Sequence, residues 1–228
     1  GRIVLHAPLH PGFDQGFEVF DSAFTGFDPR ARLNAERPAA VVVERAVAWL
    51  KTLAPDQPFF AWIHLYDAHS PYAPPAPFDA AFRTRPYDGE IAAVDRGVGT
   101  VMTLLGERGR LERTLVVAIG DHGEGLGEHG EETHGVFLYD SVLRVPWLMR
   151  LPGRERAGTV IREQVRAVDL MPTVLKALQV AVPAALDGES LVAVIRGRPR
   201  QDPPPAYAET FYPKLHFGWS ELRSVRVS

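Results

Sequence analysis

The sequence predicts an α/β fold, an α/β/α sandwich around a largely parallel sheet. Runs of residues that are apolar at every position alternate with segments whose apolar residues recur every three or four positions. The first pattern is typical of strands buried on both faces, and the second is typical of helices with one buried face. Such alternation indicates a parallel sheet covered by helices. The chain has 228 residues, 46% of them hydrophobic, which is enough to form a buried core.

The N-terminal part predicts one helix after an irregular segment. Residues 1–30 carry Gly12, Gly16 and Gly26 among several phenylalanines, which predicts a packed segment without regular structure. Over Pro38–Leu53 the apolar residues recur at helical spacing, and Pro55 closes the run. We therefore expect a helix over Pro38–Leu53.

A strand and a second helix are expected next. Phe59–Leu65 is a continuous aromatic and branched run that precedes a Pro-rich loop at residues 67–77, which predicts a strand buried on both faces. Asp88 is a candidate N-cap for a helix whose apolar stripe covers Ile91–Leu105. Gly106 is expected to end this helix.

The second half of the chain predicts two strands and a helix. Thr114–Ile119 and Val145–Met149 are apolar runs, and Pro146 is confined to the start of the second strand. Asp169–Gln179 is expected to be a helix with Asp169 as its N-cap and Pro172 in its first turn.

The chain contains no internal repeat and is expected to form a single domain. Pro199–Pro205 predicts a linker or surface loop, followed by a last strand near Leu222–Val227. The expected organisation over residues 1–228 is an irregular segment at 1–30, the main α/β part at 31–198, and the linker with the terminal strand at 199–228.

Composition excludes several classes of function. The absence of cysteine excludes disulfides, thiolate metal ligands and a cysteine nucleophile in this chain. A net charge of −3 gives no general attraction to nucleic acid, so none is expected as a partner. No run reaches the roughly 18 to 20 apolar residues of a membrane-spanning helix, so no membrane segment is expected in this chain. Any signal or membrane anchor is expected upstream of Gly1, and compartment and oligomeric state are left open.

Polar chemistry concentrates in the loops that follow two of the predicted strands. In open α/β sheets, functional groups gather in loops at the carboxyl ends of strands. Of the eight histidines, four lie in these loops: His69 after the first strand, and His122, His129 and His134 after the second.

Asp121 and His122 are the candidate metal ligands. A carboxylate oxygen and an imidazole nitrogen suit divalent ions such as Mn²⁺ or Zn²⁺. Adjacent residues on a regular strand would point in opposite directions, but Gly120 and Gly123 permit a sharp turn in which both side chains converge. An isolated Asp-His pair more often forms a turn cap and a surface histidine. Four glycines among residues 120–129 favour the metal site.

His69 and His134 are the candidate catalytic residues. His69 can donate a hydrogen bond to an anionic oxygen or a leaving group, although it could equally fix a Pro-rich turn. His134 follows His122 by 12 residues across a Gly-rich turn, and as imidazolium it would stabilise a developing negative charge. His64 in the buried strand and His129 in the loop are weaker candidates, interpreted as a core histidine and as a residue that organises the loop. Glu124 and Glu128 could be hydrogen-bond partners of the site residues, although most glutamates in loops are solvated, and they are left out of the predicted site.

Several stretches, in their order along residues 12–212, resemble the sulfatase family of the alkaline phosphatase superfamily. The resemblance implies an alkaline phosphatase-like fold, with Asp121 and His122 as ligands of a catalytic Ca²⁺ or Mn²⁺, Zn²⁺ also being possible. It further implies that His69 contacts the sulfate or phosphate group and that His134 lies near the transferred group. The stretches are residues 59–72, 87–91, 120–130, 134–140, 143–146, 168–173 and 186–191.

One part of the family pattern is absent. Members carry, towards the N-terminus, further acidic ligands and a nucleophile within a Cys/Ser-x-Pro-x-Arg motif, and this sequence has neither that motif nor a cysteine. We therefore expect the chain to be the C-terminal portion of a longer catalytic domain, inactive alone, because a metal and histidines do not supply the attacking group.

The resemblance implies a metal-dependent sulfuric ester hydrolase in the intact protein, acting on a small-molecule or glycan ester. One alternative is a phosphodiester or phosphonate monoester hydrolase, or a phospho-head-group transferase, because relatives with these activities also carry histidine after the metal-binding aspartate. The alternative from another class is a non-catalytic module that binds a metal or an anionic glycan.

Overall fold

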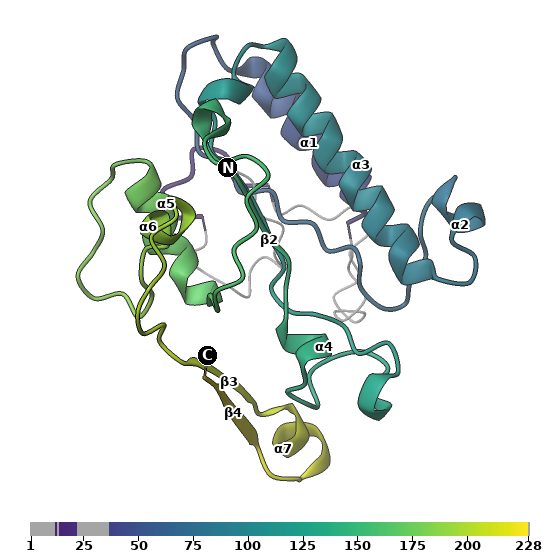
Figure 1. The fold of residues 1–228 in the computed structure, drawn as a ribbon. Helices are drawn as coiled ribbons and strands as arrows, with labels where there is room; N and C mark the ends of the chain where they lie inside the picture. The colour runs from purple at the N-terminus through teal and green to yellow at the C-terminus, as the bar shows by residue number, and fades with distance from the viewer. Residues whose placement is uncertain (1–11, 13, 22–36, 228) are drawn as a thin grey trace. The chain divides into compact units, whose positions relative to one another are not determined.

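The structure is a computed structural model that describes residue 12, residues 14–21 and residues 37–227. The chain divides into two compact units, Gly1–Leu111 and Glu112–Ser228. In the described residues, the first unit contains helices and irregular segments, and the second contains both helices and strands; Figure 1 labels most of these elements. Of the predicted N-terminal segment, residues 12 and 14–21 contain neither helix nor strand, as expected, and the remainder of residues 1–30 lies outside the described part.

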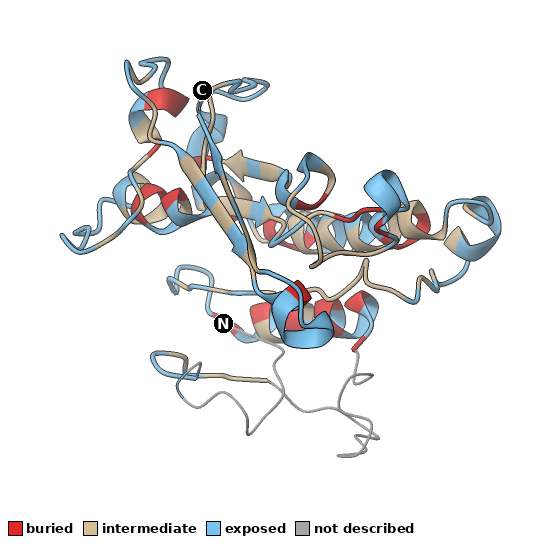
Figure 2. Cartoon of the chain, turned by 90° about the horizontal axis from the view of Figure 1, so that it is seen from below, coloured by how far each residue is buried: buried red, intermediate tan, exposed pale blue. Residues whose placement is uncertain are grey.

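The first unit is built on two long helices that lie side by side, α1 (Ala39–Thr52) and α3 (Pro86–Glu107) (Figure 1). A short helix, α2 (Phe78–Ala81), precedes α3. Burial follows the apolar spacing of the sequence and concentrates on the helices, as Figure 2 shows. The predicted helix over 38–53 is thus confirmed. The core cluster between the two helices consists of Leu50, Leu53, Leu104 and Leu105.

Helix α3 begins earlier than predicted. Asp88 is not the N-cap, because Pro86 already occupies the first helical turn and Arg85 is the cap residue. Proline suits this position, since its φ angle is preset and its missing N–H would be unpaired there in any case. Asp88 instead lies within the first turn and pairs with Arg85 at 2.8 Å. The predicted end is confirmed to within one residue.

The prediction of a strand at 59–65 is wrong. Within the described residues 59–65 the backbone forms no strand and only an isolated bridge at Ile63. Burial is one-sided: Phe59 packs edge-on against Trp49, whereas Phe60 is 65% exposed and Trp62 42% exposed. Continuous apolar character marks an extended segment, but a strand also requires a neighbouring backbone to pair with.

The second unit contains a pair of strands that carries the candidate site. Strand β1 (Val116–Ile119) pairs with β2 (Trp147–Arg150), so both predicted strands are confirmed in shortened form. Their pairing is antiparallel, with Val116 opposite Arg150. The described residues hold two sheets of two antiparallel strands each, so the expected parallel pairing is not found among them. Between β1 and β2 lies no crossover helix, only the four-residue α4 (Asp140–Leu143) and one 3₁₀ turn, whereas parallel neighbours require a long crossover.

The remainder of the second unit consists of two short helices and a hairpin. Helices α5 (Leu170–Ala177) and α6 (Val192–Ile195) adjoin a cluster of buried aliphatic residues that packs against Trp147. Strands β3 (Ala206–Thr210) and β4 (Leu222–Arg226) are antiparallel and flank α7 (Tyr212–Phe217), which confirms the predicted last strand. Short 3₁₀ turns lie at Leu111–Arg113, Glu128–Gly130, Pro152–Arg154 and Ala167–Asp169. In the described part of the chain, no helix has both the length and the apolar character needed to cross a membrane.

Asp169 occupies the N-cap position of α5, as predicted, but its carboxylate makes no capping hydrogen bond to that helix. The side chain is fully buried, and its oxygens accept hydrogen bonds from the Arg166 guanidinium at 2.8 Å and the Glu189 backbone N–H at 2.9 Å. A buried carboxylate with charged and backbone donors joins segments 20 residues apart.

We therefore predict that Asp169→Asn lowers the free energy of unfolding by about 2 kcal/mol, because the amide loses the ion pair and one acceptor. Urea denaturation measures this, and the exposed Asp202→Asn is the control, with an expected change below about 0.5 kcal/mol. Equal stability of the two variants would contradict the structural role of Asp169.

Candidate functional site

The candidate site lies in the loop that follows β1. The Gly120 N–H donates to the Pro146 carbonyl at 3.1 Å, which extends the contact between the two chain segments just beyond the strands. The loop then folds back on itself, since the Gly123 N–H donates to the Val142 carbonyl at 2.8 Å. Asp121 and His122 lie between these two anchored glycines, at the carboxyl end of β1.

Glycine is required at two places where backbone segments meet. A Cβ at Gly123 would overlap the Ser141 carbonyl oxygen, and a Cβ at Gly125 would overlap the Glu131 carbonyl oxygen. The Gly125 N–H also donates to the Thr133 carbonyl at 2.7 Å, which fixes the residue before His134. The glycine pattern thus brings residues 122 and 134 together across the loop.

We predict that Gly123→Ala lowers the free energy of unfolding by about 1–3 kcal/mol, because the added methyl group must displace backbone rather than a flexible side chain. Gly120→Ala is the matched control: its Cβ would meet Pro146 at 3.4 Å, so a change below about 1 kcal/mol is expected. Thermal unfolding of both variants measures the difference. A Gly123→Ala variant as stable as the control would mean that this close approach is not required.

Asp121 and His122 face each other, as the metal-site hypothesis requires. The Asp121 Oδ2 and His122 Nε2 atoms are 3.8 Å apart, and the two side chains are 80% and 41% exposed. The His122 Nδ1 lies 2.8 Å from the Gly123 carbonyl oxygen. A carbonyl oxygen only accepts, so Nδ1 carries the hydrogen, and the lone pair of the neutral ring is on Nε2.

His134 lies against His122 and contacts Glu124, a residue left out of the predicted site. The two imidazole ring centroids are 3.9 Å apart. His134 Nδ1 is 3.1 Å from the Glu124 carboxylate, whose side chain is only 3% exposed. Of the two alternatives that the sequence left open for Glu124, its burial and its contact with His134 favour the partner of a site residue over the solvated glutamate.

A second glutamate orders the chain after His134. Glu131 is buried, and its carboxylate accepts the backbone N–H of Val136 at 2.7 Å and that of Phe137 at 3.2 Å. His129 stacks on Tyr139 with 3.7 Å between ring centroids. These contacts agree with the interpretation of His129 as a residue that organises the loop.

His69 lies in the first unit, in a loop held by carboxylates from two directions. Its backbone N–H donates to Glu90 of α3 at 3.1 Å, and the N–H of Ala73 donates to the same carboxylate at 2.6 Å. Asp67 accepts the N–H of Ala39 at the start of α1, at 2.8 Å. Glu90 and Asp67 were not among the predicted site residues, and both act by fixing the loop backbone.

The ring of His69 has a defined orientation and borders a cavity. Its Nδ1 donates to the Ser70 carbonyl at 2.7 Å, and the ring stacks on Tyr66 with 4.4 Å between centroids. The cavity, of about 620 Å³, is also lined by Arg37, Glu90 and other residues of the first unit. Its volume is within the range of small-molecule sites.

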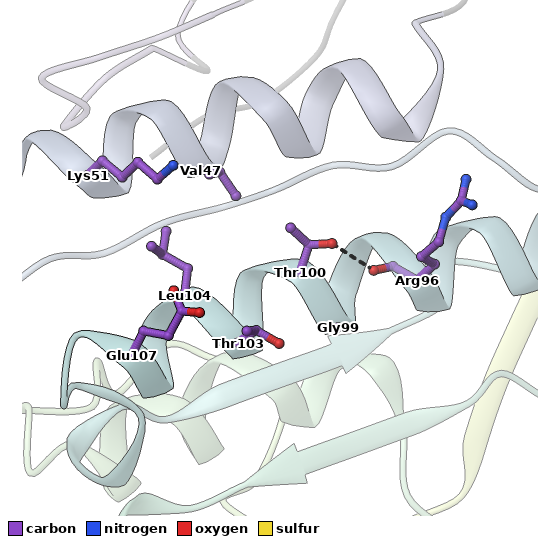
Figure 3. A pocket seen from close by; sticks show the side chains of 8 residues that line it. All are labelled: Val47, Lys51, Arg96, Gly99, Thr100, Thr103, Leu104 and Glu107. Atoms are coloured by element: carbon purple, nitrogen blue, oxygen red, sulfur yellow. Dashed lines mark hydrogen bonds between the residues drawn. The ribbon is translucent and has the colours of Figure 1, made fainter.

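A second hollow in the first unit, of about 420 Å³, contains no candidate site residue (Figure 3). It lies between α1, which contributes Val47 and Lys51, and α3. Its polar groups include Thr100, whose hydroxyl donates to the Arg96 carbonyl at 3.0 Å and thus to its own helix. This hollow offers no histidine and is not part of the candidate site.

The structure therefore brings Asp121, His122 and His134 together in the second unit, while His69 belongs to the first. A single ion can reach both Asp121 Oδ2 and His122 Nε2, because their separation is less than twice a metal–ligand distance of about 2.1 Å. Asp121 and His122 can thus fill two coordination positions of one divalent metal ion. Among residues 12, 14–21 and 37–227, no group of three or more ligating side chains could hold an ion.

Comparison with known proteins gives a consistent result. A model of the sulfatase family matches residues 11–180. Steryl-sulfatase from Mus musculus is 32% identical over 153 residues, covering 61% of this chain and 24% of that protein. An arylsulfatase from Clostridium perfringens is 31% identical over 115 residues, which cover 49% of this chain and 24% of that protein. The chain thus spans about a quarter of the length of these two relatives.

Two solved structures resemble the chain. The phosphonate monoester hydrolase SpPMH from Silicibacter pomeroyi has a TM-score of 0.55 and 28% identity, over 63% of this chain and 31% of that one. The phosphonate monoester hydrolase of Agrobacterium radiobacter has a TM-score of 0.73 and 21% identity, over 83% of this chain and 50% of that one.

Proposed function

The chain belongs to the sulfatase family, and on that premise we propose that, within the full-length protein, it supplies part of a metal-dependent site that hydrolyses sulfate esters. The alkaline phosphatase-like α/β fold expected from the sequence is confirmed by the similarity of the solved structures. The observation that carries the proposal is the convergence of Asp121, His122 and His134 in one loop of the matched region.

Asp121 and His122 would hold the metal. Sulfatases generally depend on a divalent metal, and a carboxylate with an imidazole suits Mn²⁺ or Zn²⁺. Ca²⁺, which the resemblance also implies, prefers oxygen ligands and would be bound through Asp121 and oxygen ligands from outside this sequence. When bound, such an ion polarises an oxygen of the ester and favours formation of the attacking oxyanion. The Gly123 carbonyl fixes the His122 ring with Nε2 as the ligating atom.

The two remaining histidines would act on the substrate. His134, held by Glu124, is placed to contact the transferred sulfuryl group, where a hydrogen-bond donor stabilises the charge of the transition state. His69 would contact the same group or give a proton to the departing alcohol oxygen. Both roles require a hydrogen on Nε2 as well as on Nδ1, that is, an imidazolium. The contacts of His69 with Ser70 and of His134 with Glu124 occupy Nδ1 and leave Nε2 as the nitrogen that donates to the substrate.

We further propose that the nucleophile and the other metal ligands come from residues outside this sequence. The chain has no cysteine and no Ser-x-Pro-x-Arg motif, and it spans about a quarter of the length of its relatives. In this proposal residues 1–228 form the C-terminal portion of one catalytic domain and do not turn over ester alone.

The test is turnover of two ester classes by the full-length protein with Mn²⁺. A kcat/KM higher for 4-nitrophenyl sulfate than for 4-nitrophenyl phenylphosphonate supports the sulfatase. The reverse order supports a phosphonate monoester hydrolase, the second candidate, which the 28% identity to the Silicibacter enzyme favours. Metal binding without turnover of either compound would contradict both and leave a non-catalytic metal-binding module.

A further inference from the structure

Glu124 is a buried carboxylate whose direction is imposed by the backbone on both sides. Its side chain is 3% exposed, and burial of a carboxylate is unfavourable unless hydrogen-bond donors compensate it. Gly123 donates to the Val142 carbonyl at 2.8 Å and Gly125 to the Thr133 carbonyl at 2.7 Å. The main chain on both sides of Glu124 is therefore held by backbone hydrogen bonds that do not involve its side chain.

The same turn fixes the partner of this carboxylate. Thr133, which accepts the bond from Gly125, directly precedes His134, and the His134 Nδ1 lies 3.1 Å from Glu124 Oε1. The face of the His134 ring packs against His122 with centroids 3.9 Å apart and an interplanar angle of 31°. Packing against His122 thus fixes the plane of the His134 ring. The contact with Glu124 fixes which edge of the ring, the one that carries Nδ1, faces the carboxylate.

A carboxylate accepts hydrogen bonds, so its contact with Nδ1 requires that Nδ1 carry the hydrogen. Nε2, at the opposite edge, is then the nitrogen left to face the transferred group, to which it donates when it also carries a hydrogen. A carboxylate that holds a histidine in one tautomer and orientation is a known contribution to catalysis by hydrolases.

We propose that Glu124 is a positioning residue that sets the tautomer and orientation of His134, so that Nε2 is the nitrogen presented to the transferred group. The presentation of Nε2 to the transferred group rests on the proposed function, whereas the effect of Glu124 on the tautomer of His134 does not. The alternative is that Glu124 only stabilises the loop, as Glu131 does by accepting the N–H groups of Val136 and Phe137.

The first measurement is the tautomer of His134, read from two-bond ¹H–¹⁵N NMR spectra of the ring in the 228-residue chain. We expect the Nδ1–H form in the native chain and in Glu124→Gln, whose amide oxygen still accepts the bond. In Glu124→Ala we expect a shift towards the Nε2–H form. The exposed Glu128→Ala is the control and leaves the spectrum unchanged.

The second measurement is the kinetics of the full-length protein with 4-nitrophenyl sulfate. We expect Glu124→Ala to lower kcat by about 10–100-fold with less than about a threefold change in KM, and Glu124→Gln to restore most of kcat. Far-UV circular dichroism confirms that each variant folds.

The outcomes separate this inference from the proposed function. An Nε2–H tautomer in the native chain, or a Glu124→Ala variant with the native tautomer, overturns the positioning role even if activity falls. A full-length protein that turns over no ester contradicts the proposed function. The tautomer of His134 in the Glu124 variants still tests whether Glu124 positions His134.

Discussion

Replacement of Asp121 with alanine is expected to lower the affinity of the full-length protein for Mn²⁺ by more than about 100-fold, since loss of even an outer partner of a metal ligand costs about 10–100-fold. The kcat/KM for ester hydrolysis should fall by about 10³-fold or more, because the ion supplies several kcal/mol of charge stabilisation. The reason is geometric: Asp121 Oδ2 faces His122 Nε2 at 3.8 Å, and removal of the carboxylate leaves this chain one ligand.

Calorimetry measures the affinity, and release of 4-nitrophenol measures turnover. Asp202→Ala, which removes an exposed carboxylate of the same unit, is the control and should change neither quantity. Chelation of the metal should abolish turnover of the native protein, and added Mn²⁺ should restore it. Native Mn²⁺ affinity in Asp121→Ala would refute the assignment of this residue as a ligand.

The second large effect is expected at His134. His134→Ala should lower kcat by about 10²–10³-fold, the usual consequence of removing one donor from a site that stabilises developing negative charge. His134→Lys should recover part of this loss, because an ammonium group is also a donor.

His129→Ala is the matched control for His134. Both histidines lie in the same loop, but His129 stacks on Tyr139, whereas His134 contacts Glu124 and His122. We expect His129→Ala to change kcat by less than about threefold. An equal effect of the two substitutions would show that His134 matters only through the folding of the loop.

The sequence predicts the helices of this chain better than its strands, and the reason is physical. A helix such as α1 makes its backbone hydrogen bonds within itself, so the local spacing of Val42, Val43 and Leu50 is sufficient to locate it. A strand needs a partner, and local sequence carries no information about one. Residues 59–65 have the composition of a strand without the pairing, and β1 and β2 have the pairing in the opposite sense to that expected.

The candidate site shows the same division. The sequence identifies Asp121, His122 and His134, because their residue types carry the chemistry and the intervening glycines permit a tight loop. It leaves Glu124 open between a partner of these residues and a solvated glutamate, because the choice depends on burial, and burial follows from how the loop closes. His69 belongs to the first unit, and its place in the same site remains a prediction.

The most direct test of the central claim is a crystal structure of the full-length protein with Mn²⁺, with the ion located by its anomalous scattering. The account predicts an anomalous peak about 2.0–2.3 Å from a carboxylate oxygen of Asp121 and from Nε2 of His122, with His134 beside it. A peak bound elsewhere, with these two side chains facing solvent, would contradict it.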